Sequence, residues 1–414
     1  MSDTPTVIPR SPAPDDTLAF LKNGYLYGTR RFRKLGSDAF EARLAGTRAL
    51  VMYGSEAASV FYEGDRFSRE RAMPSSVQHL LQDEGSVQTL EGEPHRHRKS
   101  MFMRMLDDAS VARLVEAFER EWTRVRAEHA GHAVPLYDVG NLVLTRAALA
   151  WAGVLAERVD DRELAGRLAA MVDAASTIGP ANWAARVRRR RAEDWASELV
   201  ADVRADRVHA DPESAIRTIA DGSDDHGAPL PEEVAAVEVL NLLRPIVAVS
   251  RFLSFTVHAM HSHPQWHALV ESDADAATRV ANEVRRFYPF FPVIAGTVQR
   301  PFEWRGREFA PGERAVLDLY ATNHDPRSWD EPGRFLPERF EGWAGDPNTL
   351  VAQGGGDAAT GHRCPGEAAT IALTARFAQL AARRPFSVPD QDLRISLRHI
   401  PALPMDRMRV EMRT

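Results

Sequence analysis

The residue with the most distinctive chemistry in this 414-residue chain is its one cysteine, Cys364, within the loop sequence GHRCPGE. A single thiol cannot form a disulfide within the chain, and no His or carboxylate follows at the spacing of a zinc site. A thiolate can be the axial ligand of a haem iron, and Gly361 and Gly366 would let the backbone approach a flat ligand closely. The alternative is a buried cysteine that packs as a small hydrophobe. The loop by itself leaves both interpretations open.

A second unusual feature is the pair Arg244-Pro245 in the otherwise apolar stretch NLLRPIVAV. A proline inside a helix offers no N–H to the carbonyl of Asn241 and costs about 3 kcal/mol. An arginine buried in such a stretch would be a charge without a partner. Either the helix bends there and Arg244 reaches solvent, or its guanidinium binds an anion. A guanidinium binds a carboxylate through two hydrogen bonds, which fix both position and direction.

The elements that must position these residues are mostly helical. Helices are predicted over residues 94–117, in several pieces over 147–207, as one long helix from Pro231 to Met260, and over 278–288. Extended chain is predicted over 48–54, over 293–319 with a hairpin turn at 304–307, and over 393–412. We therefore expect a mainly α fold with a small β-rich portion toward the C-terminus.

The bulk composition is that of a globular protein, with 44% hydrophobic and 27% charged residues. A net charge of −6 gives no overall attraction to nucleic acid or to an anionic membrane. The polar, proline-rich N-terminus lacks the pattern of a signal peptide, and no apolar run is long enough to span a bilayer. We expect a cytoplasmic location, a flexible N-terminal arm over residues 1–15 and a single domain over residues 16–414.

Three motifs follow one another in a specific order along the C-terminal half of the chain. They are E-x-x-R at 283–286, P-E-R-F at 337–340 and the cysteine loop. Their order and spacing resemble the cytochrome P450 superfamily, over nearly the whole chain. The resemblance implies a mainly α, haem-thiolate cytochrome fold that binds haem b and acts as one catalytic domain. It also implies Cys364 as the iron ligand, with a structural cluster of Glu283, Arg286 and Arg339 behind it.

The chain departs from the common superfamily pattern in two places. The cysteine loop has Asp357 and Thr360 where phenylalanine and glycine are usual, and three glycines at 354–356 extend it. The long helix lacks the acid–threonine pair that delivers protons during oxygen activation, and Arg244-Pro245 stands there instead. An R-P pair in this helix resembles the fatty-acid peroxygenase branch. Local matches at 65–67, 92–103, 179–183 and 286–290 support that resemblance.

The branch implies hydroxylation of a fatty acid at its α or β carbon with H2O2 as oxidant. Arg244, next to Pro245, would hold the carboxylate, and this carboxylate would act as general acid and base. Gln88 aligns with a distal position at which histidine favours decarboxylation, so we expect hydroxylation with minor alkene formation. The alternative is an ordinary loop glutamine. Phe290 and Phe291 would line an acyl channel or fill the core.

Several basic residues are candidates for contacts with the haem propionates. His362 holds the position, two before the cysteine, that commonly meets a propionate in the superfamily. The other candidates are Arg66, His95, Arg98 and Lys99. The alternative for these residues is a solvated basic face.

The resemblance implies a fatty acid and hydrogen peroxide as partners, with no redox protein. The net charge and the lack of a long apolar run predict no nucleic-acid or membrane partner. A monooxygenase of the same fold that receives electrons from ferredoxin is one alternative, although Arg244-Pro245 leaves it no carboxyl–hydroxyl relay. A haem-binding sensor without turnover is another. Turnover with peroxide and no reductase would separate these hypotheses.

Overall fold

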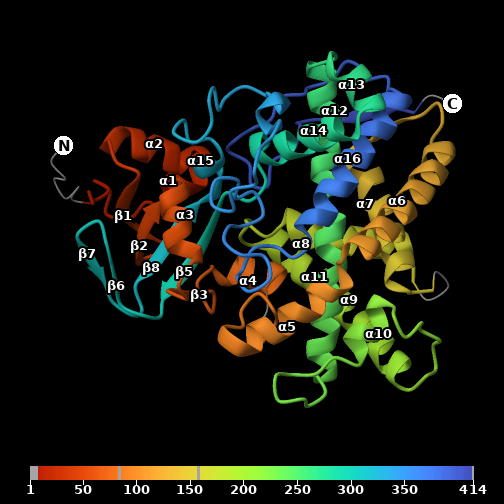
Figure 1. Cartoon of the computed structure of the whole chain (residues 1–414), viewed down its shortest axis with the longest axis horizontal. Coiled ribbons are helices and arrows are strands. Elements are labelled where there is room, and N and C mark those ends of the chain that lie inside the picture. The colour runs from red at the N-terminus through yellow and green to blue at the C-terminus, as the bar shows by residue number, and fades with distance from the viewer. Residues whose placement is uncertain (1–7, 83–84, 156–158, 413–414) are drawn as a thin grey trace.

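The structure of the chain is a computed structural model that describes residues 8–82, 85–155 and 159–412. The mainly helical fold expected from the sequence is confirmed, with the helices filling most of the molecule and the main sheet at one side (Figure 1). The helices in the first half are α1 (Thr17–Asn23), α2 (Leu26–Leu35), α3 (Ser55–Tyr62), α4 (Ser75–Leu81), α5 (Gly92–Met105), α6 (Asp108–Glu128), α7 (Leu136–Ala152), α8 (Asp161–Asp173) and α9 (Pro180–Arg204). The later helices are α10 (Ala215–Ala220), α11 (Glu232–Ala248), α12 (Ser250–Ser262), α13 (Trp266–Ser272), α14 (Ala274–Phe287), α15 (Leu319–Asn323), the 3-10 helix η2 (Pro337–Phe340) and α16 (Glu367–Arg383).

The strands form three separate sheets within the described residues. Five of them make the main sheet in the order β1-β2-β8-β5-β3, in which β2 and β8 run parallel. Their bounds are β1 (Ala39–Leu44), β2 (Thr47–Met52), β3 (Phe67–Ser68), β5 (Val293–Val298) and β8 (Arg314–Asp318). The pairs β4 (Ala133–Pro135) with β9 (Arg409–Glu411), and β6 (Phe302–Trp304) with β7 (Arg307–Phe309), make the other two.

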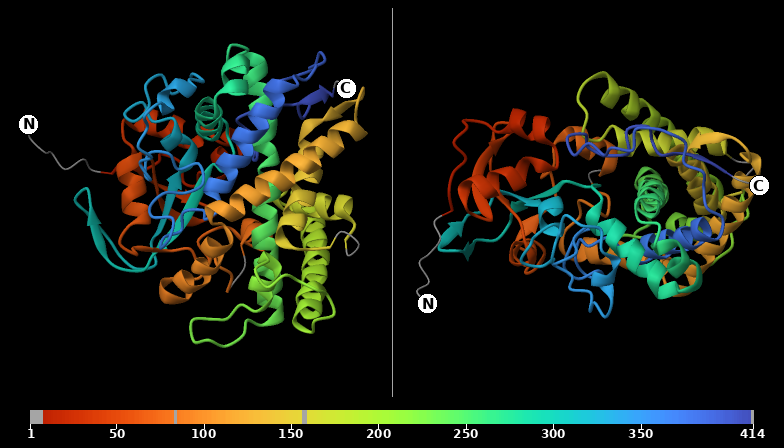
Figure 2. Two further views of the ribbon diagram at one scale, coloured as in Figure 1. Left: turned by 45° about the vertical axis from the view of Figure 1, so that its right-hand side comes forward. Right: turned by 90° about the horizontal axis from the view of Figure 1, so that it is seen from above.

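The long helix predicted from Pro231 to Met260 is two helices, α11 and α12, that follow one another through Val249. Pro245 lies inside α11, where it removes one helical hydrogen bond, and α11 ends one turn later. The Val249 N–H then bonds the Ile246 carbonyl at 3.1 Å, a tighter turn than an α-helix makes. Seen from above, α11, drawn in green, is viewed almost along its axis and is surrounded by other elements (Figure 2).

The helix predicted over residues 94–117 is also divided, into α5 and α6. Asp107 ends the first segment because its side chain accepts a hydrogen bond from the Ser110 N–H at 2.7 Å and caps α6. α5 is thereby free to run in its own direction, and it carries His95, Arg98 and Lys99.

The extended chain predicted over residues 393–412 is wrong for most of its length. Within it, strand-like structure is limited to β9, an isolated bridge between Ile395 and Pro404, and another between Met412 and Ala130. Pro404 has no N–H for a sheet ladder, and Arg407 and Met408 have positive φ angles of 57° and 52°. The hairpin turn at 304–307 is confirmed, because Arg305 and Gly306 both have positive φ and Trp304 pairs with Arg307.

The largest hydrophobic core lies among the helices, with α11 and α12 at its centre, and a smaller core lies against the main sheet.

The start of the expected N-terminal arm, residues 1–7, lies outside the described residues. Further along, Glu41 of β1 donates its N–H to the Pro9 carbonyl at 2.8 Å. In the part of the chain that the structure covers, no helix is long and apolar enough to cross a membrane.

Candidate active site

Cys364 lies in the loop that leads into α16. Its N–H donates to the Gln353 carbonyl at 3.0 Å, and Gly366 precedes the first residue of α16. Burial raises the pKa of the thiol, and the hydrogen bond from the Gly366 N–H and the charge of Lys99 offset only part of that rise. A cation and a helix N-terminus beside a thiol both favour the thiolate, the form that binds a metal.

The three extra glycines bring this loop against Tyr62 of α3. A Cβ on Gly356 would lie 2.8 Å from the Cβ of Tyr62, and Gly354 and Gly356 have φ angles of 94° and 72°. Larger residues would be excluded by both contact and conformation. The glycine extension therefore allows the loop to lie directly against α3.

Lys99, predicted to contact haem, holds the backbone of the cysteine loop. The residue is 2% exposed, and its Nζ donates to the Arg363 carbonyl at 2.5 Å and to the Gly361 carbonyl. Burial lowers its pKa to about 8. The structure thus ties α5 to the segment around Cys364.

Arg285 supports the same loop from α14, and sequence reasoning missed it. Its Nε donates to the Gln353 side chain at 3.0 Å, and its Nη2 bonds the carboxylate of Glu367. Glu367 also accepts a hydrogen bond from Arg363 at 2.5 Å. The sequence signal was present but masked, because Arg285 lies inside the E-x-x-R motif as one of its variable positions.

The cluster predicted from that motif is present, with Glu283 and Arg286 fully buried and Arg339 partly buried. Arg286 donates to both oxygens of Glu283 at 2.6 and 2.7 Å, and Arg339 reaches the same carboxylate at 3.3 Å. Glu283 also accepts the Leu336 N–H at 2.8 Å. These bonds join α14 to η2 behind the cysteine loop.

The predicted residues His95 and His362 lie together, with ring centroids 4.1 Å apart. His362 Nε2 lies 3.1 Å from a carboxylate oxygen of Glu91, whose other oxygen accepts the Arg69 N–H at 2.5 Å. Burial lowers the pKa of His95 to about 3, so this ring is neutral. The predicted Arg66 is not part of this group, since it bonds the Glu63 carbonyl at 2.9 Å, and Arg69 is the arginine that is buried here.

Arg98 on α5 forms a buried ion pair with Glu238 of α11, with Nη1 and Oε1 2.6 Å apart. Its Nε is buried and has no hydrogen-bond partner among the described residues. A buried donor of this kind calls for an acceptor, and the oxygens of a propionate would satisfy it. Sequence reasoning found Arg98 but not Glu238.

Arg244 does not reach solvent, because its side chain is buried and the residue is 4% exposed. Its guanidinium donates to the carbonyls of Leu80 and Leu81, at 3.1 and 2.7 Å, and to the Asn241 side-chain oxygen at 3.0 Å. Among the described residues, no carboxylate lies within ion-pair distance of it. Burial lowers the pKa of Arg244 to about 9, so it still carries its charge at neutral pH.

The two residues predicted to act beside Arg244 lie on α11 and on the loop before α5. Pro245 is exposed on α11, although Arg244 and Ile246 on either side of it are buried. The side-chain oxygen of Gln88 accepts a hydrogen bond from Ser86 at 2.8 Å.

The two predicted channel residues differ in their surroundings. Phe290 is buried and packs edge-on against Phe252 of α12, with centroids 5.4 Å apart. Phe291, 4.4 Å from Phe290 between centroids, is 40% exposed.

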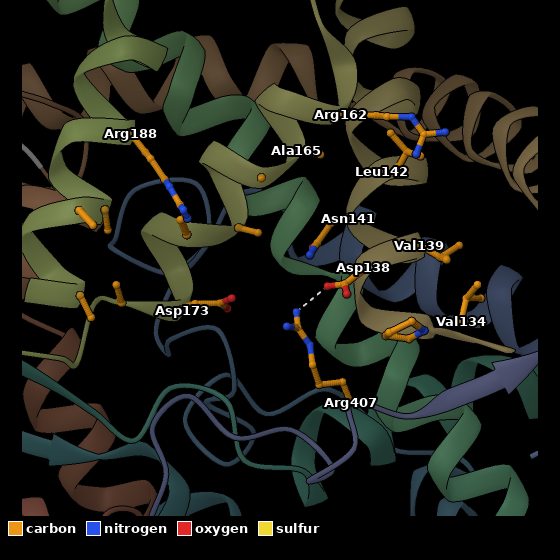
Figure 3. Close-up of a pocket in the computed structure, with 18 of the residues that line it drawn as sticks. Val134, Asp138, Val139, Asn141, Leu142, Arg162, Ala165, Asp173, Arg188 and Arg407 are labelled. Atoms are coloured by element: carbon orange, nitrogen blue, oxygen red, sulfur yellow. Dashed lines mark hydrogen bonds and ion pairs between the residues drawn. The ribbon is translucent and has the colours of Figure 1, made fainter. Parts of the chain in front are cut away.

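A cavity of about 750 Å³ lies between α7, α8 and α9. Its walls hold many alanines, and the arginines at 162, 188 and 407 lie around it (Figure 3). Arg407 forms an ion pair with Asp138 at 2.5 Å across it. None of the predicted site residues lines this cavity.

Solved structures similar to this one cover nearly the whole chain. Cytochrome P450EX alpha (CYP152N1) with myristic acid is 40% identical, with a TM-score of 0.93 and 98% of each chain covered. Cytochrome P450 OleT, ligand-free, is 32% identical with a TM-score of 0.94 and 98% of each chain covered. The chain belongs to the cytochrome P450 family. Within it, this P450 falls in the fatty-acid peroxygenase branch, CYP152.

Other comparisons agree over shorter stretches. The family model "Cytochrome P450" matches residues 273–359. Cytochrome P450 3A11 of Mus musculus is 27% identical over 126 residues, which is 26% of this chain and 25% of that protein. Cytochrome P450 3A5 of Homo sapiens is 28% identical over the same share of each. The match therefore spans about a quarter of the length of these curated relatives.

Membership of the P450 family makes haem b the cofactor and this protein an oxidoreductase. The donor set fits that group, since a lone thiol lies beside a cation at a helix N-terminus and a buried arginine nitrogen lacks an acceptor.

Proposed function

We propose that this P450 uses hydrogen peroxide to hydroxylate fatty acids at the α or β carbon, with minor decarboxylation to terminal alkenes, within one catalytic domain over residues 16–414. The observation that carries the proposal is the buried cation of Arg244, which has only neutral acceptors among the described residues. The myristic acid named with P450EX alpha supports a fatty acid as substrate.

A fatty-acid carboxylate supplies the counter-charge that Arg244 lacks. Taking a charge out of water is costly unless it is paired, so binding the acid relieves a cost already present in the free protein. Two parallel hydrogen bonds from the guanidinium fix the direction of the headgroup. The carbons next to the carboxylate are then placed nearest to the oxidant, and this placement sets the position of hydroxylation.

Haem b bound through the Cys364 thiolate supplies the oxidation chemistry. Lys99 and the N-terminus of α16 favour the thiolate form of that side chain. Arg98, His95 and His362 are the residues we assign to the propionates. Arg66 is left out of this assignment because its guanidinium bonds backbone carbonyls of its own segment.

The proton carrier in this proposal is the bound substrate itself. From Asn241 to Ile246, α11 offers no acid and no threonine, and Gln88 has a neutral amide that cannot titrate. A carboxylate held by Arg244 can take a proton from peroxide and return it to the leaving oxygen. No electron-transfer protein is then needed.

The test is turnover of a fatty-acid panel by the haem-loaded protein with hydrogen peroxide and no reductase, with products identified by mass spectrometry. We expect 2-hydroxy and 3-hydroxy acids as the main products, and alkenes as minor ones. Turnover only with ferredoxin and its reductase would favour an ordinary monooxygenase. Conversion of stearic or myristic acid mainly to the alkene would contradict the role given to Gln88.

A further inference from the structure

Glu238 of α11 is a buried carboxylate with 0% exposure that accepts hydrogen bonds from three separate parts of the chain. The donors are Arg98 Nη1 of α5 at 2.6 Å, the Val87 N–H at 3.0 Å and the Asn241 side-chain amide at 2.8 Å. Two of these contacts lead directly to groups that the proposed function uses.

The first route runs through Asn241 to Arg244. A carboxylate only accepts hydrogen bonds, so Glu238 obliges Asn241 to point its Nδ2 toward it. The Asn241 oxygen is thereby turned toward Arg244, whose Nη2 donates to it at 3.0 Å. Glu238 thus fixes the orientation of an amide that in turn holds the guanidinium.

The second route runs through Val87 to Gln88. The Glu238 Oε1 that pairs with Arg98 also accepts the Val87 N–H, which belongs to the residue before Gln88. This bond attaches the loop before α5 to the same helix that carries Arg244. Glu238 therefore contributes to the position of Gln88 relative to Arg244.

The charges are consistent with this arrangement. Glu238 balances the charge of Arg98 and leaves the charge of Arg244 available for an anion, because Asn241 between them is neutral. Burial raises the pKa of Glu238, and the hydrogen bonds from Asn241 and Arg98 oppose that rise.

We propose that Glu238 is a positioning residue. It helps to fix the orientation of Arg244 and the position of Gln88 relative to it, and so determines which carbon of the fatty acid is oxidised. This inference rests on the proposed function. A carboxylate with a merely structural role, as the partner of Arg98, would affect haem retention or stability and leave the product pattern unchanged.

Glu238→Gln tests the inference with almost no change in side-chain shape. Its new amide N–H₂ would face the Asn241 N–H₂, and if Asn241 turns over it presents Nδ2 to Arg244, donor against donor. Glu232→Gln is the matched control, because it makes the same change at an exposed position of α11. Both haem-loaded variants are compared with the unmodified protein for KM, kcat, the ratio of 2-hydroxy to 3-hydroxymyristic acid, and the ferrous–CO spectrum.

We expect Glu238→Gln to raise KM for myristic acid roughly tenfold and to change the product ratio, with an unchanged ferrous–CO spectrum. An unchanged KM and product ratio in Glu238→Gln would overturn the inference. If Glu238→Gln does not retain haem, Asn241→Ala is the deciding variant, because it removes the contact between Glu238 and Arg244 and keeps the Arg98–Glu238 pair. A KM and product ratio equal to those of the unmodified protein in Asn241→Ala would also overturn the inference.

A failure of the proposed function is distinguishable from a failure of this inference. If the unmodified protein yields no oxidised product with peroxide, the proposed function fails. The dissociation constant of myristic acid, measured by the shift of the haem absorption band, then compares Glu238→Gln with the unmodified protein. Weaker binding in the variant supports the positioning of Arg244, and equal binding contradicts it.

Discussion

At the scale of single residues, the site combines the Cys364 thiol with an arginine, Arg244, that has no charged partner among the described residues. Arg244 is held by two backbone carbonyls and one amide oxygen, all of which are neutral. Neutral acceptors orient a guanidinium without cancelling its charge. The side chain is therefore both rigid and able to bind an anion, which is what a carboxylate anchor requires.

Arg244→Ala should abolish fatty-acid hydroxylation and keep the haem. Losing two charge-assisted hydrogen bonds to the substrate should lower kcat/KM by about a hundredfold or more. The measurement is peroxide-driven turnover of myristic acid, with the ferrous–CO spectrum as a check on thiolate ligation. The control is Arg188→Ala, which removes an exposed arginine of α9. Full activity in Arg244→Ala would mean that another residue anchors the substrate.

Lys99→Met should weaken haem retention much more than fatty-acid binding. The change leaves the Gly361 and Arg363 carbonyls without their buried donor and removes the cation beside Cys364. We expect haem to transfer to excess apomyoglobin roughly tenfold faster than from the unmodified protein. Lys34→Met, at an exposed position of α2, is the control. The assignment fails if haem loss is unchanged while fatty-acid affinity falls.

At the scale of elements, helix boundaries decide which side chains meet. The division at Asp107 lets α5 lie against the cysteine loop and α11 while α6 packs in the helical core. The proline in α11 has a related role, because the carbonyl that loses its partner belongs to Asn241, the residue whose amide holds Arg244.

Asp107→Ala should destabilise the protein by about 1 kcal/mol, the usual cost of losing an N-cap. Its carboxylate accepts the Ser110 N–H at the start of α6, whereas the neighbouring exposed Asp108 caps nothing in the described structure. Asp108→Ala is therefore the matched control. Urea unfolding of the haem-loaded proteins measures the difference, and equal midpoints for the two variants would contradict the role given to the cap.

At the scale of the whole molecule, a buried acid lies where the main sheet passes into the short helix α15. Asp318, at the end of β8, is buried and caps α15 by accepting the Ala321 N–H at 2.8 Å. Burial raises its pKa to about 7, so the folded protein holds a proton there that the unfolded chain releases near pH 4.

Stability should therefore fall as pH rises from about 4 to about 7. The folded-state pKa of Asp318 lies above the unfolded value of 3.8, so its contribution is full below pH 3.8 and is lost as pH rises through about 7. Asp318→Asn should flatten this dependence, because an amide keeps the cap and cannot ionise. The free energy of unfolding of the haem-loaded protein at a series of pH values measures the slope. Asp330→Asn, an exposed position, should leave the slope unchanged, and the same slope in Asp318→Asn would refute the assignment.

The sequence by itself determined the fold class and the principal chemistry. One thiol, the spacing of the motifs before it and the R-P pair in an apolar stretch identify the family and its branch, because each is local and chemically unusual. The family resemblance also implied that Glu283 and Arg286 belong to one cluster, and the structure confirms that they form a buried ion pair.

Only the tertiary structure decided which residues surround these groups. Periodicity assigns a side chain to a face of its helix, but the segment packed on that face comes from elsewhere in the chain. Lys99 meets the cysteine loop, Arg69 rather than Arg66 is the buried arginine near Glu91, and Glu238 of α11 accepts the Val87 N–H. Such pairings depend on the packing of the whole core, so no local pattern in the sequence could reveal them.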